Sequence, residues 1–147
     1  MKAELLARCV ELANSRVLAL EKELSDMRLA VQSESKSTAG DKHETGRAMI
    51  HLEQEKLHQQ LAEAKLILAE FQQIDSELKN EKVGLGSLVK TNKGTFYLAA
   101  SIGKVEFNEA DYFVVSAKAP IAKQFLGKHA GETANMNGMV YDILAVE

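Results

Sequence analysis

Hydrophobic residues in the first half of the chain recur at spacings of four and three, which is typical of helices with one apolar seam. Two such series can be followed. The first contains Leu6, Val10, Ala13, Val17, Leu20, Leu24, Met27 and Val31, and the second contains Ile50, Leu57, Leu61, Ala64, Leu68, Phe71 and Leu78. Charged residues fill the remaining faces, so each helix must bury its seam against a partner.

The polar stretch QSESKSTAG, residues 32–40, separates the two series and is short enough for a turn between antiparallel helices. We therefore predict a helical hairpin in which each helix covers the seam of the other. Met49 is expected to fill the seam near the turn. Pairing of each seam with another chain stays open as an alternative. A first helix of about 26 residues would be roughly 40 Å long.

The second half has a different pattern, in which short β-rich runs alternate with turn signals. PIAKQFLG places Pro120 at the first position of a short helix that stops at Gly127. Ile121, Phe125 and Leu126 are expected to face the sheet. The predicted strands are SLVKT (87–91), TFYLAAS (95–101), DYFVVS (111–116) and MVYDILAV (139–146). These elements predict a small α+β domain with a twisted, mostly antiparallel sheet.

Composition changes near Lys82. Of the nine glycines in the chain, only Gly40 and Gly46 precede this point, together with one aromatic residue, Phe71. We therefore predict an antiparallel coiled-coil arm over residues 1–82, with its tip near 33–46, and a separate domain over residues 83–147. The stretch EKVGLG, residues 81–86, is the expected joint.

Charge and composition exclude several classes of protein. The net charge of −3 argues against direct binding to nucleic acid, which needs a concentrated basic face, so contact with RNA or DNA is expected only through a partner. No apolar run approaches eighteen residues, and the N-terminus lacks the core of a signal peptide, so we expect a soluble cytoplasmic protein that does not enter a membrane. The single cysteine, Cys9, fits a small buried hydrophobe. No pattern for a stand-alone enzyme is present.

The motif GDKHETG, residues 40–46, lies between the two seams and carries Asp41 and Glu44 at a spacing of three. This spacing fits a capping box, with Asp41 as the N-cap and Glu44 at the third helical position. It also fits a pair of oxygen ligands for Mg²⁺ on a protruding tip, and the two interpretations can coexist. Glycine within a helix costs up to about 1 kcal/mol, so we expect the second helix to begin nearer Thr45 or Gly46.

The layout and two motifs resemble the Gre family of bacterial transcript-cleavage factors over nearly the whole chain. The family has an N-terminal coiled-coil arm and a C-terminal domain of FKBP-like fold. GDKHET, residues 40–45, is similar to its tip pattern G-D-x-x-E-N, and VVSAKAPIAKQFLGKHAGE, residues 114–132, is similar to its S-P-I-A, helix and G-K pattern. Two positions depart from the family: Thr45 stands for Asn, and Ala119 stands for Ser, which would cap the short helix and be worth about 1 kcal/mol.

The resemblance implies a monomeric factor without a cofactor of its own, whose arm enters the secondary channel of RNA polymerase. Asp41 and Glu44 would there help to hold an Mg²⁺ shared with the polymerase and assist cleavage of backtracked RNA, so the factor would stimulate an enzyme without being one. Candidate contacts with the polymerase are Lys42, Thr45, Arg47, Lys128, His129 and Glu132. Two alternatives stay open: a Gre-like modulator or inhibitor that does not promote cleavage, and a coiled-coil adaptor or chaperone.

Overall fold

The computed structural model describes the backbone of residues 1–35 and 40–147, and the side chains of residues 1–32 and 46–147. Two long helices are followed by a six-stranded sheet and one short helix, which confirms the expected α+β class. The chain divides into two compact units, residues 12–66, and residues 1–11 together with 67–147. We call the first the arm and the second the sheet unit. None of the described helices is long and apolar enough to cross a membrane.

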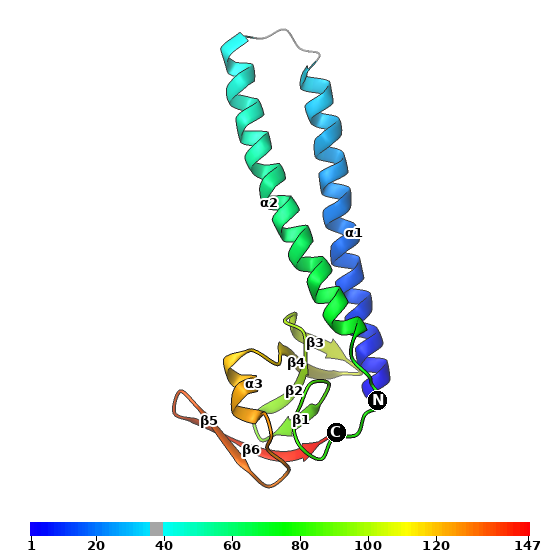
Figure 1. The fold of residues 1–147 in the computed structure, drawn as a ribbon, viewed down its shortest axis with the longest axis vertical. Coiled ribbons are helices and arrows are strands. Elements are labelled where there is room, and N and C mark those ends of the chain that lie inside the picture. Colours follow the sequence, from blue (N-terminus) through cyan, green and yellow to red (C-terminus); the bar gives the residue numbers. More distant parts are fainter. Residues whose placement is uncertain (36–39) are drawn as a thin grey trace. The chain divides into compact units, whose positions relative to one another are not determined.

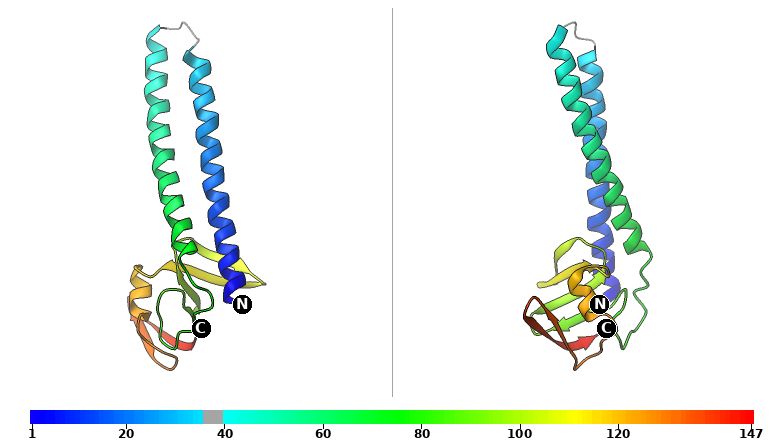
Figure 2. Two further views of the ribbon diagram at one scale, coloured as in Figure 1. Left: turned by 45° about the vertical axis from the view of Figure 1, so that its right-hand side comes forward. Right: turned by 60° about the vertical axis from the view of Figure 1, so that its left-hand side comes forward.

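The arm is formed by parts of α1 (Lys2–Ser35) and α2 (Gly40–Gln72), which run antiparallel beside each other (Figures 1 and 2). Leu20 and Leu24 of α1 are almost fully buried, and Leu57 and Ala64 are buried on α2. Only these two helices belong to the arm, so each seam is covered by the other helix. The arm is therefore the predicted hairpin within one chain.

Both helices of the hairpin start or end at other residues than the sequence predicted. The first helix has 34 residues, about 50 Å at 1.5 Å per residue, because it begins at Lys2, before Leu6, and continues to Ser35, beyond Val31. The second helix begins at Gly40, so the expectation of a start near Thr45 or Gly46 is wrong. Polar side chains such as glutamine and glutamate form helices well without contributing to a seam, so the apolar pattern alone ended too early.

The seam also departs from the prediction at three places. At the start of α1, Leu5 and Cys9 are fully buried, whereas Leu6 and Val10 are only partly buried. This follows from a run of four-residue spacings from Leu5 to Val17, which the heptad pattern did not reproduce. Cys9 is a buried free thiol, as expected.

The remaining two departures lie on the second series. Because α2 ends at Gln72, Leu78 lies beyond the helix and its side chain is 53% exposed, and Ile74 is buried instead. Met49 is 65% exposed and does not fill the seam.

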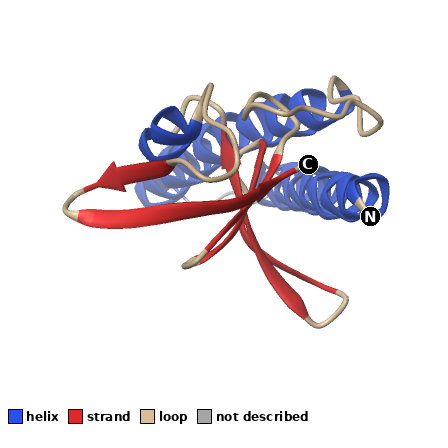
Figure 3. Ribbon diagram, turned by 90° about the horizontal axis from the view of Figure 1, so that it is seen from below, coloured by secondary structure: helices blue, strands red, loops and turns tan. Residues whose placement is uncertain are grey.

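The sheet unit contains one sheet with the strand order β3-β4-β2-β1-β6-β5. All neighbouring pairs are antiparallel except β2 with β4, which are parallel, so the prediction of a mostly antiparallel sheet is confirmed. Figure 3 shows the twist of the strands, with α3 on the side of β5 and β6. The bounds are β1 Leu88–Thr91, β2 Gly94–Ala99, β3 Gly103–Phe107, β4 Ala110–Ser116, β5 Thr133–Met136 and β6 Met139–Val146, with α3 at Pro120–Phe125.

Two of these strands, β3 and β5, were not predicted. The sequence TANM of β5 lacks β-branched and aromatic residues apart from Thr133, so its composition gives a weak strand signal. The two-residue turn Asn137–Gly138, at φ of 53° and 80°, joins it to β6, and this Asn-Gly pair is the strong hairpin signal in the sequence for β5.

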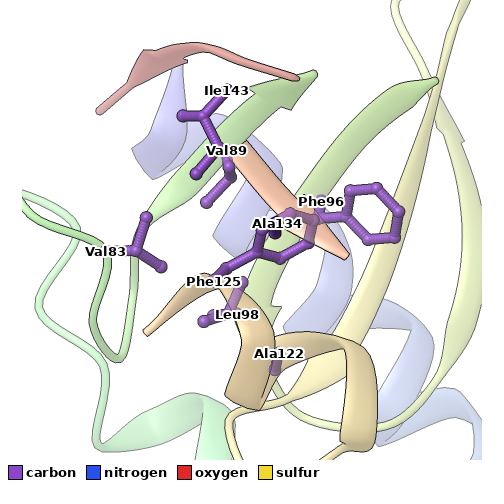
Figure 4. Close-up of a cluster of buried hydrophobic side chains, with 8 residues drawn as sticks. All are labelled: Val83, Val89, Phe96, Leu98, Ala122, Phe125, Ala134 and Ile143. Atoms are coloured by element: carbon purple, nitrogen blue, oxygen red, sulfur yellow. The ribbon is translucent and has the colours of Figure 1, made fainter. Parts of the chain in front are cut away.

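The central strands β1 and β2 carry buried side chains on both faces of the sheet, since successive side chains of a strand point in opposite directions. On β2, Phe96 and Leu98 join the cluster under α3, whereas Tyr97 belongs to the other face and is fully buried as well. Figure 4 shows the cluster under α3, with Phe125 reaching the sheet. Its buried members are Val83, Val89, Phe96, Leu98, Ala122, Phe125, Ala134 and Ile143.

Candidate functional site

The motif with the two carboxylates lies at the start of α2, at the end of the arm where the helices are joined. The backbone of Gly40 to Thr45 is helical, so the positions of Asp41 and Glu44 are one turn apart on one side of the helix. The first turn of a helix has free backbone N–H groups and the positive end of the helix dipole. Because α2 begins at Gly40, Asp41 is its second residue and Glu44 its fifth, so the predicted capping box with Asp41 as the N-cap and Glu44 at the third helical position is wrong. Negative charge at both positions is still favoured by the positive end of the helix.

The side chains of several predicted site residues lie outside the described residues, namely those of Asp41, Lys42, Glu44 and Thr45. Arg47 is the first charged side chain described after the motif, and it is exposed. No group of three or more His, Cys, Asp or Glu side chains that could hold a metal occurs among the residues that the structure describes. The proposed magnesium ligands thus remain a prediction from the sequence.

The C-terminal motif forms the end of β4, a turn and helix α3. Ala119 is the N-cap of α3, with an extended backbone at φ −63° and ψ 147°, and it provides no side-chain cap. Its N–H donates to the carbonyl of Ser116 at 2.9 Å, and its carbonyl accepts from the N–H of Lys123 at 3.0 Å. Pro120 at the first helical position confirms the predicted start of this helix.

One face of α3 packs on the sheet, with a correction at its end. Ala122 and Phe125 are fully buried, and Ile121 is partly buried against the same cluster. Leu126 was expected to face the sheet, but 41% of it is exposed. It is the C-cap, at φ −52° and ψ 131°, and its backbone has left the helical conformation that keeps side chains on one face.

The three candidate contact residues after α3 are held in a turn by their own hydrogen bonds. The Lys128 ammonium donates to the carbonyl of Thr133 at 2.6 Å, and the His129 backbone N–H donates to Oε2 of Glu132 at 2.8 Å. The same Oε2 lies 3.8 Å from His129 Nε2. Substituting these residues would therefore change the turn as well as any contact with a partner.

The turn is also joined to the segment that follows the arm. The Val83 N–H donates to the carbonyl of Lys128 at 2.8 Å, and the Gly127 N–H donates to the carbonyl of Val83 at 2.9 Å. Gly127 has φ 78°, a conformation in which glycine is strongly favoured, and this explains why the helix stops there. The predicted joint near residues 81–86 is thus tied into the sheet unit at Val83.

Lys2 was not among the predicted site residues, and it is buried in the sheet unit. Its exposed fraction is 9%, and its Nζ donates to the carbonyl of Leu78 at 2.8 Å. Burial lowers the pKa of this lysine, while the charges of Glu147 and Asp75 oppose that shift. Lys2 is one of the residues that line a groove of about 790 Å³. Lys2 precedes Leu5 by three residues and Cys9 by seven, so it lies on the same buried face of α1, and this spacing could have predicted its burial.

No family model and no curated protein matches this chain. The matching solved structures include one of the transcription factor Gfh1, at 16% identity and a TM-score of 0.39, covering 94% of this chain and 92% of that chain. A second is the GreA factor homolog 1 (Gfh1) protein of Thermus thermophilus, at 14% identity and a TM-score of 0.36, covering 94% of each chain. Values this low do not establish a shared function.

Proposed function

We propose that this chain is a transcription factor that binds RNA polymerase and inserts its helical arm into the secondary channel. Asp41 and Glu44 would there help to hold an Mg²⁺ shared with the polymerase during cleavage of backtracked RNA. The observation that carries the proposal is the position of GDKHET at the start of α2, where the two helices of the arm are joined. RNA polymerase is proposed as the partner because both motifs are similar to those of the Gre family.

The chemistry is consistent with an arm that supplies only part of a metal site. In two-metal hydrolysis one ion activates water and the other stabilises the leaving oxygen. Mg²⁺ takes oxygen ligands, and one or two carboxylates suffice when the partner and the RNA supply the others. Two carboxylates at the end of an arm could therefore complete a site that belongs to the polymerase, and Arg47, Lys42 and Thr45 beside them could contact the channel or the RNA.

The sheet unit would dock on the rim of the polymerase and direct the arm. The turn with Lys128, His129 and Glu132 is the candidate contact, because it follows the α3 motif that resembles the family. The side chains of Lys128 and Glu132 are held in a defined arrangement by hydrogen bonds to the backbone of Thr133 and His129. A preorganised turn loses little entropy on binding, which supports its use as a contact surface.

A second function is favoured by one observation: α2 begins at Gly40, before both carboxylates. Asp41 then lies in the first turn and Glu44 one turn further along the helix, so both carboxylates can be stabilised by the positive end of the helix in place of a metal. A factor in this state would occupy the channel and modulate the polymerase without promoting cleavage.

The test is an RNA-cleavage assay on stalled elongation complexes, with the wild-type protein compared with the Asp41→Asn/Glu44→Gln variant. The control is Glu53→Gln/Glu63→Gln, which removes the same charge from exposed positions of α2. We expect Mg²⁺-dependent cleavage with the wild type and the control, and its loss with the tip variant at unchanged helicity. Binding of all three proteins without cleavage would instead identify the modulator, and absence of binding would favour the adaptor.

A further inference from the structure

Strand β3 lies at one edge of the sheet, so one side of its backbone has no neighbouring strand among the residues that the structure describes. A two-residue turn joins Phe107 of β3 to Ala110 of β4, and in such hairpins the residues that flank the turn form a hydrogen-bonded pair. Hydrogen-bonded and non-hydrogen-bonded pairs alternate along antiparallel strands. The N–H and C=O groups of Lys104 and Glu106 therefore point away from β4.

The opposite edge of the sheet, β5, is protected in a way that β3 is not. The ammonium of Lys128 donates to the carbonyl of Thr133 on β5 at 2.6 Å, and α3 packs beside this strand. By contrast, β3 contains no proline, and its register with β4 is regular from Gly103 to Phe107, without a β-bulge. An edge strand that lacks these features can pair with a strand of another chain.

The charged side chains of β3 are complementary to those of the same strand running in the opposite direction. Lys104 and Glu106 lie two residues apart, so both side chains point to the same face of the sheet, on either side of Val105. If two copies of β3 pair antiparallel with their Val105 residues opposite each other, Lys104 of each copy faces Glu106 of the other. The same two pairs then carry the backbone hydrogen bonds between the copies.

Within its own hairpin, Glu106 lies opposite a residue of like charge. Its partner across the hairpin is Asp111, and like charges directly opposite each other are unfavourable. Nζ of Lys104 lies 3.3 Å from Oδ2 of Asp111, whereas no ion pair of Glu106 occurs among the described residues. A second copy would place a lysine opposite Glu106, which its own chain does not.

We propose that this chain forms a two-fold symmetric dimer in which the β3 strands of two copies pair antiparallel and extend the sheet. Val105 lies on the symmetry axis, and Lys104 and Glu106 form two reciprocal pairs, as a two-fold interface requires. The inference is independent of the proposed function and goes beyond the monomer that the resemblance implied. Two short strands bury little surface, so we expect a weak dimer that depends on protein concentration.

The experiment measures the dimer dissociation constant of the full-length protein by analytical ultracentrifugation. Lys104→Glu leaves two acidic side chains on β3 and Glu106→Lys leaves two basic ones, so each variant alone should dimerise at least about tenfold more weakly. An equimolar mixture of these two variants should recover dimers, because every pair between the copies then joins opposite charges. Lys123→Glu makes the same charge change at an exposed position of α3 and should leave the constant unchanged.

A wild type that stays monomeric at every concentration would overturn the inference, and so would equal weakening by Lys123→Glu, since net charge would then be the cause. The mixture decides whether the pairs lie between copies. If it dimerises no better than each variant alone, loss of the ion pair between Lys104 and Asp111 explains the variants, and the inference fails. Amide hydrogen exchange of the wild type needs no variant: exchange at Lys104 and Glu106 should slow as the concentration rises, and unchanged exchange would refute the dimer.

Discussion

The arm and the sheet unit are stabilised in different ways. In the arm, two helices share one seam, and large apolar side chains outside it, such as Leu18, Leu29 and Leu66, are more than half exposed. In the sheet unit, side chains on both faces of the sheet are buried, and Tyr97, Val114 and Phe125 are completely shielded. The stability of the arm should therefore depend on a narrow seam and on helix propensity, whereas that of the sheet unit should depend on burial.

The largest expected effect tests burial in the sheet unit. Phe125→Ala removes a fully buried ring that lies 5.2 Å from Phe96 and 5.8 Å from Tyr141, centroid to centroid. We expect a loss of about 3–5 kcal/mol in the free energy of unfolding of the sheet unit, measured by urea denaturation. Leu126→Ala, at the neighbouring exposed position, should cost less than about 1 kcal/mol. Similar losses for both variants would contradict the assignment of the core.

A smaller effect is expected in the arm. Leu20→Ala deletes a seam side chain that is 1% exposed, and it should cost about 2–3 kcal/mol, the low end for leucine, because two helices can close around the space more easily than a sheet can. Hydrogen exchange measured by region should show the loss within residues 12–66. Leu18→Ala, which is 57% exposed, is the control and should change little. Equal loss of protection in the sheet unit would show that the two regions do not unfold separately.

The face of the sheet with Tyr97 predicts a loss of stability at alkaline pH. Burial raises the pKa of the Cys9 thiol to about 11 and that of the Tyr97 hydroxyl to about 12, above their ordinary values of 9.0 and 10.0. A raised pKa in the folded state gives stability that is complete below the unfolded pKa and lost as the pH rises through the folded pKa. The free energy of unfolding should thus be constant up to about pH 9 and fall between pH 9 and 12, by roughly 2–3 kcal/mol per group.

Urea unfolding at several pH values measures this loss, and Tyr97→Phe separates the two groups. The Tyr97 hydroxyl is buried without a hydrogen-bond partner among the described residues, so its removal should be neutral or stabilising by up to about 1 kcal/mol at pH 7. The same variant should keep the loss above pH 9 that Cys9 causes and lack the further loss above pH 10. A strongly destabilised Tyr97→Phe would show that the hydroxyl has a partner.

The sequence predicted the middle of the arm correctly and parts of the sheet unit incorrectly. One physical reason explains both outcomes. The middle of the seam, from Ala13 to Leu24, followed from its spacing because two facing helices bury every third or fourth residue. The prediction of the seam was wrong at Leu5 and Cys9, which are buried in the sheet unit. It was also wrong at Leu78, which lies beyond the end of α2. Patterns within one element cannot show contacts made with another element. For that reason the sequence could not predict the parallel pairing of β2 with β4.

The site was predictable only as a motif. Asp41 and Glu44 were located from their spacing, and the backbone adds that they lie one turn apart within the first two turns of α2. The hydrogen bonds of Lys128, His129 and Glu132 could not be inferred, because they depend on the path of the chain after α3. The sequence did predict that Ala119 leaves α3 without a side-chain cap, and the structure confirms this.

Adding a cap at Ala119 tests whether helix capping contributes to the free energy of unfolding of the sheet unit, where burial dominates. Ala119→Ser places a hydroxyl at the N-cap of α3, where it can accept a hydrogen bond from a backbone N–H of the first turn. We expect a gain of about 1 kcal/mol in the free energy of unfolding. Ala130→Ser, in the exposed turn after α3, is the control and should have no such effect. No gain from Ala119→Ser would mean that the packing of Phe125 alone holds this helix.

The smallest expected effect concerns the turn between β3 and β4, where Asn108 and Glu109 both have positive φ, 50° and 62°. This conformation costs most residues about 1–2 kcal/mol, whereas asparagine and glycine tolerate it. Glu109→Gly relieves the strain but increases the entropy of the unfolded chain, which returns about half of the gain, so we expect a net stabilisation of about 0.5 kcal/mol.

The matched control is Asn108→Gly, which adds the same entropy cost while relieving little strain, and it should be neutral or slightly destabilising. Thermal unfolding of the two variants in parallel measures the difference. If both stabilise equally, strain at Glu109 is not the cause. If Glu109→Gly alone stabilises, a backbone term adds measurably to stability even in the region where burial dominates, and the contrast with the arm is then one of degree.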